Sequence, residues 1–229
     1  MVVIGHSQGG LLTKMTAIDS GDRFWTNVSQ RPFEEVSLSP ESRALLQGAL
    51  FLKPLPFVKR LIFLCTPHRG SFLAGPQIAR RLVQRLVRLP SDVVGAGTEL
   101  NGLLSHESGY LSFERLPTSI DNMDPGNRFI RALAEIPIAP GVTAHSIIAV
   151  SQEKDVEEGD DGVVKYQSAH IDGVESELVV HSGHSAQANP HTVAKVQRIL
   201  LEHLAAVQAE QTVPPALRRV GGDGLREEP

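Results

Sequence analysis

The sequence of 229 residues contains a single cysteine, Cys65, which excludes an intrachain disulfide. Because Cys65 stands in an apolar run, we expect an inert, buried thiol. Positive charge is not in excess either: 22 basic residues stand against 26 acidic ones, a net charge of -4. This balance predicts no nucleic-acid partner. The most apolar stretch, residues 49–65, is interrupted by charged residues and prolines, so no membrane span is expected.

Two common kinds of ligand site are also missing from the sequence. A phosphate-binding glycine loop needs a lysine after its second glycine, and the glycine-containing segment at residues 5–10 does not supply it. His181, His184 and His191 lie near aspartates, but their spacing fits neither H-E-x-x-H nor a paired-cysteine zinc pattern. We therefore expect no metal and no cofactor.

The most informative feature present is the pentapeptide Gly5-His6-Ser7-Gln8-Gly9, which follows the apolar residues 2–4 and precedes two leucines. A strand, a serine flanked by glycines and a helix make up the nucleophile elbow of a serine hydrolase. The serine holds a strained turn, and we expect a side chain at either flanking glycine to collide there. His6 is expected to serve the structure. The competing interpretation is an ordinary helix N-cap at Ser7.

Apolar runs at residues 1–4, 59–65, 143–150 and 174–180 predict four buried strands. Helical patterns cover residues 8–20, ended by Gly21, and residues 41–51, 76–89, 126–136 and 189–207. In the last helix we expect Ile199, Leu200 and Leu204 to face inward. This alternation predicts an α/β protein with a mostly parallel sheet flanked by helices. We expect one domain over residues 1–208, with cap-like insertions at 22–57 and 91–125, and a disordered tail at 209–229.

Three polar side chains follow expected strands in the order serine, acid, histidine. A serine hydroxyl needs a histidine base that a carboxylate orients, and on a parallel sheet such groups gather at the carboxyl ends of the strands. Ser7, Asp161 and His184 satisfy both the order and the placement. The alternatives that stay open are Asp160 or Asp155 as the acid and His181 as the base. His68 as the base would break the chain order, so we expect His68 and Arg69 to line the cleft or to satisfy loop carbonyls.

These segments resemble bacterial α/β-hydrolases of the esterase and lipase type. The elbow is similar in Gly5-His6-Ser7-Gln8-Gly9-Gly10, the acid loop in Asp161-Gly162-Val163-Val164, and the histidine segment in Gly183-His184-Ser185. A recurrent segment of these esterases is similar to Thr66-Pro67-His68-Arg69-Gly70-Ser71. The resemblance covers residues 1–207 and implies the carboxyl-terminal part of an α/β-hydrolase fold.

The resemblance implies cleavage of small-molecule or lipid esters through an acyl-enzyme, with the main-chain N-H of Gln8 in the oxyanion hole. Complete members of the family carry further strands and a second oxyanion donor before the elbow. We therefore expect this chain to be a piece of a longer hydrolase that is poorly soluble and weakly active alone. The alternatives are acyl transfer or thioester cleavage by the same triad, and an inactive module that keeps the fold for binding.

Overall fold

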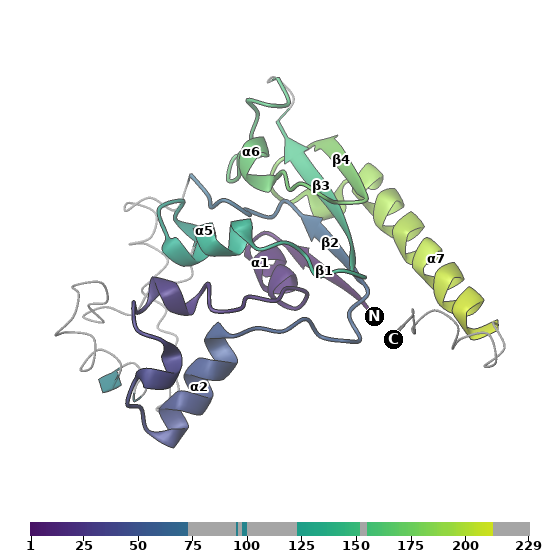
Figure 1. The fold of residues 1–229 in the computed structure, drawn as a ribbon. Helices are drawn as coiled ribbons and strands as arrows, with labels where there is room; N and C mark the ends of the chain where they lie inside the picture. The colour runs from purple at the N-terminus through teal and green to yellow at the C-terminus, as the bar shows by residue number, and fades with distance from the viewer. Residues whose placement is uncertain (73–94, 96–97, 100–122, 152–154, 213–229) are drawn as a thin grey trace, which may run out of the picture.

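The computed structural model of the protein describes residues 1–72, 95, 98–99, 123–151 and 155–212. Its centre is a four-stranded sheet in the order β1-β2-β3-β4, in which all neighbouring strands run parallel. The strands are β1 (Val2–His6), β2 (Arg60–Leu64), β3 (Thr143–Val150) and β4 (Ser176–His181). Figure 1 shows helices on both faces of this sheet. The α/β class and the parallel sheet predicted from the sequence are thus confirmed.

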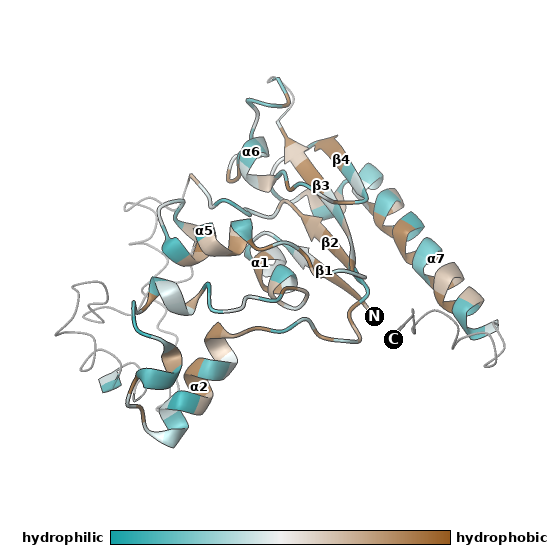
Figure 2. Ribbon diagram, viewed as in Figure 1, coloured by the Kyte–Doolittle hydropathy of each residue, from teal (hydrophilic) through white to brown (hydrophobic). Residues whose placement is uncertain are grey.

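The burial of the strands follows their position in the sheet. Leu61, Ile62 and Phe63 of β2 are completely buried, because helices cover both faces of this inner strand. Parallel strands covered on both faces have continuous apolar sequences, which explains the brown strands of Figure 2. β1 lies at one edge of the described sheet, and its Ile4 is 44% exposed.

Helix α7 (Pro190–Thr212) covers one face of the sheet, and α1 (Gln8–Met15) lies against the other. Ile199 of α7 packs with Ile62 and Ile147, whereas the opposite face gathers Phe63 and Ala17. Further helices in the described ranges are α2 (Pro40–Leu50), α5 (Arg128–Glu135), α6 (Tyr166–Ala169) and the short η1 (Trp25–Asn27), η2 (Phe33–Glu35) and η4 (Ala186–Ala188). None of the helices in the described ranges has the length and apolarity that a bilayer crossing demands.

Segment 22–57, expected to be an insertion, builds a small core against which Phe129 of α5 also packs. Its buried members, which pack together, are Trp25, Val28, Phe33 and Val36. Helix α2 begins after Ser39, whose hydroxyl accepts a hydrogen bond from the main-chain N-H of Ser42 at 3.2 Å. Such a serine cap stabilises the first turn of a helix, and α2 begins one residue before the expected start at residue 41. The expected helix at 76–89 and most of the expected insertion at 91–125 lie outside the described residues.

Three expectations about the helices were wrong. α1 ends at Met15 rather than at residue 20, and the Thr16 hydroxyl donates to the Thr13 carbonyl at 2.7 Å just after that end. α7 continues to Thr212, so residues 209–212 of the expected disordered tail are helical, and residues 213–229 lie outside the described residues. Leu200 and Leu204 are 36% and 54% exposed, because α7 meets the sheet along a narrow stripe that includes Ile199.

A buried lysine joins α1 to α5. Lys14 is 1% exposed, and its ammonium group donates to the carbonyl oxygens of Leu133 at 2.7 Å and Ala134 at 3.2 Å. The last carbonyls of a helix have no partner within the helix, and a cation there also interacts favourably with the helix dipole. Arg23 donates to a further carbonyl of this end, that of Glu135. Burial, followed by the charge of Arg69, lowers the pKa of Lys14 from 10.5 to about 8.

We expect the substitution Lys14→Met to change how stability depends on pH. Since the pKa of Lys14 is about 8 in the folded chain and 10.5 in the unfolded one, the unfolded state binds more protons between these values. The free energy of unfolding of the natural chain should therefore rise, relative to the variant, from pH 8 to pH 10.5. Urea unfolding across this range measures the difference, and a flat or falling difference would contradict a buried lysine with a lowered pKa.

Candidate active site

The backbone between β1 and α1 pushes Ser7 out at the carboxyl end of the sheet. Ser7 has φ 54° and ψ -130°, a conformation that few residues other than glycine adopt. Its N-H donates to the carbonyl oxygen of Leu64 in the neighbouring strand at 2.8 Å, which holds the turn against β2. The strained turn expected from the sequence is therefore present, and Ser7 directly precedes the first turn of α1.

Glycines allow this turn to pack closely, but not at both of the expected positions. A methyl group on Gly5 would lie 2.3 Å from the Thr13 hydroxyl and 2.6 Å from the Cα atom of Gly10. On Gly10 it would lie 1.8 Å from the hydroxyl of Thr66, which follows β2. On Gly9 it would meet nothing within 4 Å. The expected collision at Gly9 was therefore wrong, since this residue lies on the open side of α1, and Gly10 is the second position where space is restricted.

Three residues that are far apart in the sequence form a hydrogen-bonded chain at this end of the sheet. The hydroxyl oxygen of Ser7 lies 2.8 Å from Nε2 of His184. On the other side of the ring, Nδ1 of His184 lies 2.8 Å from Oδ2 of Asp161. Since the carboxylate accepts from Nδ1-H, Nε2 is the nitrogen that accepts a hydrogen bond from the Ser7 hydroxyl. The three residues chosen from the sequence are brought together in the order that a triad requires.

The loop that carries Asp161 holds its carboxylate in place. The Asp161 side chain is 1% exposed, and its Oδ1 accepts the main-chain N-H groups of Val163 at 2.9 Å and Val164 at 2.7 Å. Gly162 has φ 91°, which permits the tight turn beneath the carboxylate. These donors stabilise the ionised carboxylate and leave Oδ2 facing the imidazole ring.

The alternative acids and base lie elsewhere. The Asp160 carboxylate accepts the N-H of Gly162 at 2.9 Å instead of meeting the ring of His184, and Asp155 is exposed in the same loop. His181 is an exposed residue at the end of β4. The structure therefore unites Asp161, not Asp155 or Asp160, with the histidine that meets the serine.

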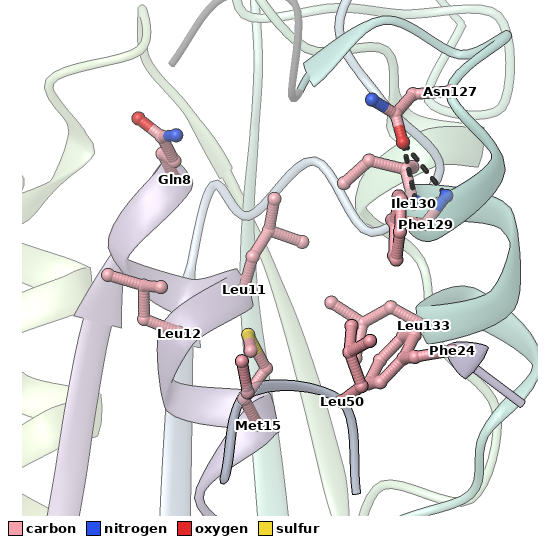
Figure 3. A pocket seen from close by; sticks show the side chains of 11 residues that line it. Gln8, Leu11, Leu12, Met15, Phe24, Leu50, Asn127, Phe129, Ile130 and Leu133 are labelled. Atoms are coloured by element: carbon pink, nitrogen blue, oxygen red, sulfur yellow. Dashed lines mark hydrogen bonds between the residues drawn. The ribbon is translucent and has the colours of Figure 1, made fainter. Parts of the chain in front are cut away.

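An apolar cavity of about 270 Å³ lies along α1, and its lining begins at Gln8, the residue that follows Ser7. Gln8 is one of its polar lining residues and opens α1, and the first main-chain N-H groups of a helix point out of its amino end. Figure 3 shows α1 and α5 as the two main walls, with Phe24 and Leu50 between them. The apolar lining side chains include Leu11, Leu12, Met15, Phe24, Leu50, Phe129, Ile130 and Leu133. The helix expected at residues 126–136 was not expected to border a cavity, although its apolar positions gave a signal for a buried face.

His68 and Arg69 do not border this cavity. His68 is 2% exposed and packs edge-on against Phe63, with ring centroids 4.6 Å apart. Burial, then the charges of Lys14 and Arg69, lowers the pKa of His68 to about 3, so the ring is neutral at physiological pH. Arg69 donates to the carbonyl oxygens of Gln167 and His170 and borders a different cavity. Arg69 therefore has the second expected role, at loop carbonyls. The expectation for His68 was wrong: it packs against Phe63, and both of its buried ring nitrogens lack a hydrogen-bond partner among the described residues.

The thiol nearest the triad is not poised for chemistry. Burial, and then the negative charge of Asp161, raises the pKa of Cys65 to about 12. This agrees with the expected inert thiol.

Within the described ranges, the residues that place possible metal-ligating atoms within 4.8 Å of one another are His6, Cys65 and His184. The grouping of His181, His184 and His191 considered from the sequence is not formed. A metal at the first group would need the neutral thiol to ionise and would compete with the hydrogen bonds of both histidines.

No protein-family model matches this chain, and no curated protein matches it.

The three elbow glycines give a matched set of variants. We expect Gly10→Ala to lower the free energy of unfolding by about 1–3 kcal/mol, because the methyl group would collide with Thr66. Gly5→Ala should be at least as harmful, since main-chain atoms surround its site. Gly9→Ala is the control: it should be neutral or stabilising by up to about 1 kcal/mol, the helix preference of alanine over glycine. Thermal and urea unfolding measure all three, and a Gly9→Ala variant as damaged as Gly10→Ala would contradict the close packing described here.

Proposed function

We propose that this protein is a serine hydrolase that cleaves carboxylic esters by two-step acyl transfer. The observation that carries the proposal is the continuous hydrogen-bonded chain from Ser7 through His184 to Asp161, built on a strained turn between strand and helix. The parallel sheet and the motif resemblance support placing the chain with the α/β-hydrolases of the esterase and lipase type. Segment 22–57 then corresponds to a cap-like insertion beside the elbow.

Each residue has a role in the proposed mechanism. His184 accepts the proton of Ser7 as the serine oxygen attacks the ester carbonyl carbon. Asp161 holds the ring with Nδ1-H towards itself and stabilises the imidazolium that forms. The main-chain N-H of Gln8 donates to the developing oxyanion at the amino end of α1. His184 then protonates the leaving alcohol and, in the second step, activates the water that cleaves the acyl-enzyme.

The cavity supports an apolar acyl group as the part of the substrate that binds beside the serine. Its walls from α1 and α5 carry leucine, isoleucine, methionine and phenylalanine side chains, and its polar residues are Gln8 and Asn127. Burying an apolar chain in such a cavity contributes to binding in proportion to the area removed from water. A small-molecule or lipid ester is therefore the proposed substrate class. The same triad also serves acyl transfer, in which an alcohol replaces water as the acceptor, and thioester cleavage, in which a thiol replaces the alcohol as the leaving group.

Labelling with a fluorophosphonate probe tests the triad. We expect the full chain to be labelled at Ser7 and the Ser7→Ala variant to be unlabelled, because the probe phosphonylates an activated serine. Asp161→Asn should lower kcat on a p-nitrophenyl ester by about 10⁴-fold, since the ring of His184 would lose its correct tautomer.

Two neighbouring substitutions serve as controls for the triad. Asp160→Asn keeps the acceptor for Gly162, and His181→Ala removes an exposed side chain, so both should retain labelling and turnover. A chain that resists labelling while folding cooperatively would overturn the proposed enzyme in favour of an inactive binding module. Loss of turnover in Asp160→Asn but not in Asp161→Asn would move the acid to the neighbouring residue.

The size of the cavity predicts a change in acyl preference. Met15 lies half-buried in the wall formed by α1, and Met15→Trp should fill part of the space. We expect the ratio of kcat/KM for an octanoate ester over an acetate ester to fall by about 10-fold or more. Leu201→Trp on the exposed side of α7 is the matched control and should leave the ratio unchanged. An unchanged ratio in Met15→Trp would place the acyl group elsewhere.

A further inference from the structure

The residues His6 and Ser7 contact the two ends of His184. The Ser7 hydroxyl lies at Nε2 of the His184 ring, while Nε2 of the His6 ring lies 2.8 Å from the main-chain oxygen of the same residue. The two imidazole rings are 5.0 Å apart between centroids and are tilted by 46°. Since a carbonyl oxygen only accepts, the His6 Nε2 atom carries the proton and donates it.

The segment that carries His184 needs such a support. It lies between the end of β4 and η4, where neither a helix nor a strand fixes the main chain. Ser182 N-H donates to the carbonyl oxygen of Val150 at 3.2 Å, which ties the start of the segment to β3. The bond from His6 ties the histidine itself to a strand at the opposite side of the sheet.

His6 lies on a rigid part of the fold. It is the last residue of β1 and pairs with Leu64 of β2, and its side chain is half-buried. Because His6 and Ser7 are covalent neighbours, the nucleophile and the donor that holds its base cannot drift apart. A shift of the His184 segment away from β1 would lengthen both hydrogen bonds together.

We propose that His6 is a positioning residue that sets the distance between His184 and Ser7 by donating a hydrogen bond to the His184 carbonyl oxygen. The inference rests on the proposed function, in which that distance governs proton transfer. Misplacing a catalytic group by about 1 Å is able to lower the rate by about 100-fold. A purely space-filling role for the ring predicts instead that any aromatic residue of similar size would serve.

Two substitutions separate these roles. His6→Phe keeps an aromatic ring without the donor, whereas His6→Gln keeps an N-H donor without the ring. We expect kcat on a p-nitrophenyl ester to fall roughly 10- to 100-fold in His6→Phe, with KM changed by less than about threefold. His6→Gln should restore kcat to within about threefold of the natural chain. His191→Phe, which replaces an exposed histidine of α7, is the control and should leave kcat unchanged.

Nuclear magnetic resonance of the full chain gives a readout that needs no substrate. We expect the ¹⁵N shifts of His6 to show the Nε2-H tautomer, and the Nδ1 proton of His184 to exchange faster with water in His6→Phe than in His6→Gln. Equal kcat in all three proteins, or an equal loss in both variants, would overturn the inference, as would an Nδ1-H tautomer of His6. If the unsubstituted protein is not labelled by the probe and does not hydrolyse the ester, the proposed function is wrong. The tautomer of His6 and the exchange rates would then test the positioning role alone.

Discussion

The parallel register of the four strands is the constraint on which the site depends. β1 ends level with β2, and β3 ends level with β4. The loops that follow β1, β3 and β4 therefore all leave the sheet at the carboxyl end of its strands. Those loops carry Ser7, Asp161 and His184. No short-range pattern could bring these residues within hydrogen-bond distance, because the first and last are separated by most of the chain. The sheet therefore provides the proximity, and the loops provide the orientation.

Two buried charged side chains hold the parts of the site that lie outside the sheet. Asp161 is stabilised by two main-chain N-H groups of its own loop, and Lys14 by two main-chain carbonyl groups at the end of α5. An ion that is removed from water without such partners is strongly unfavourable, so each loop or helix end is held in the geometry that satisfies its ion. The first ion sets the orientation of the histidine. The second joins the two walls of the apolar cavity.

The sequence predicted the features that depend on local chemistry. Short patterns predicted the turn at Ser7 and the four strands. The order serine, acid, histidine along the chain selected Asp161 and His184, and the structure brings these residues together. What failed depends on packing between distant segments. Gly10 rather than Gly9 faces Thr66 because of how α1 sits on β2, and Leu200 and Leu204 are exposed although their spacing is helical. The partners of Lys14 lie far away in the sequence and could not be inferred from its neighbours.

The energetics of the site bear on whether it serves catalysis or only folding. The dihedral angles of Ser7 carry a strain of roughly 1–3 kcal/mol, and a buried carboxylate adds a desolvation penalty that apolar residues of similar volume would avoid. A module that kept the fold only to bind a partner would be more stable without either feature. Ser7 and Asp161, which carry these two unfavourable features, both contact the ring of His184, one at each nitrogen. This convergence favours a site in which a proton moves along the chain of hydrogen bonds over one in which the same side chains merely fill the end of the sheet.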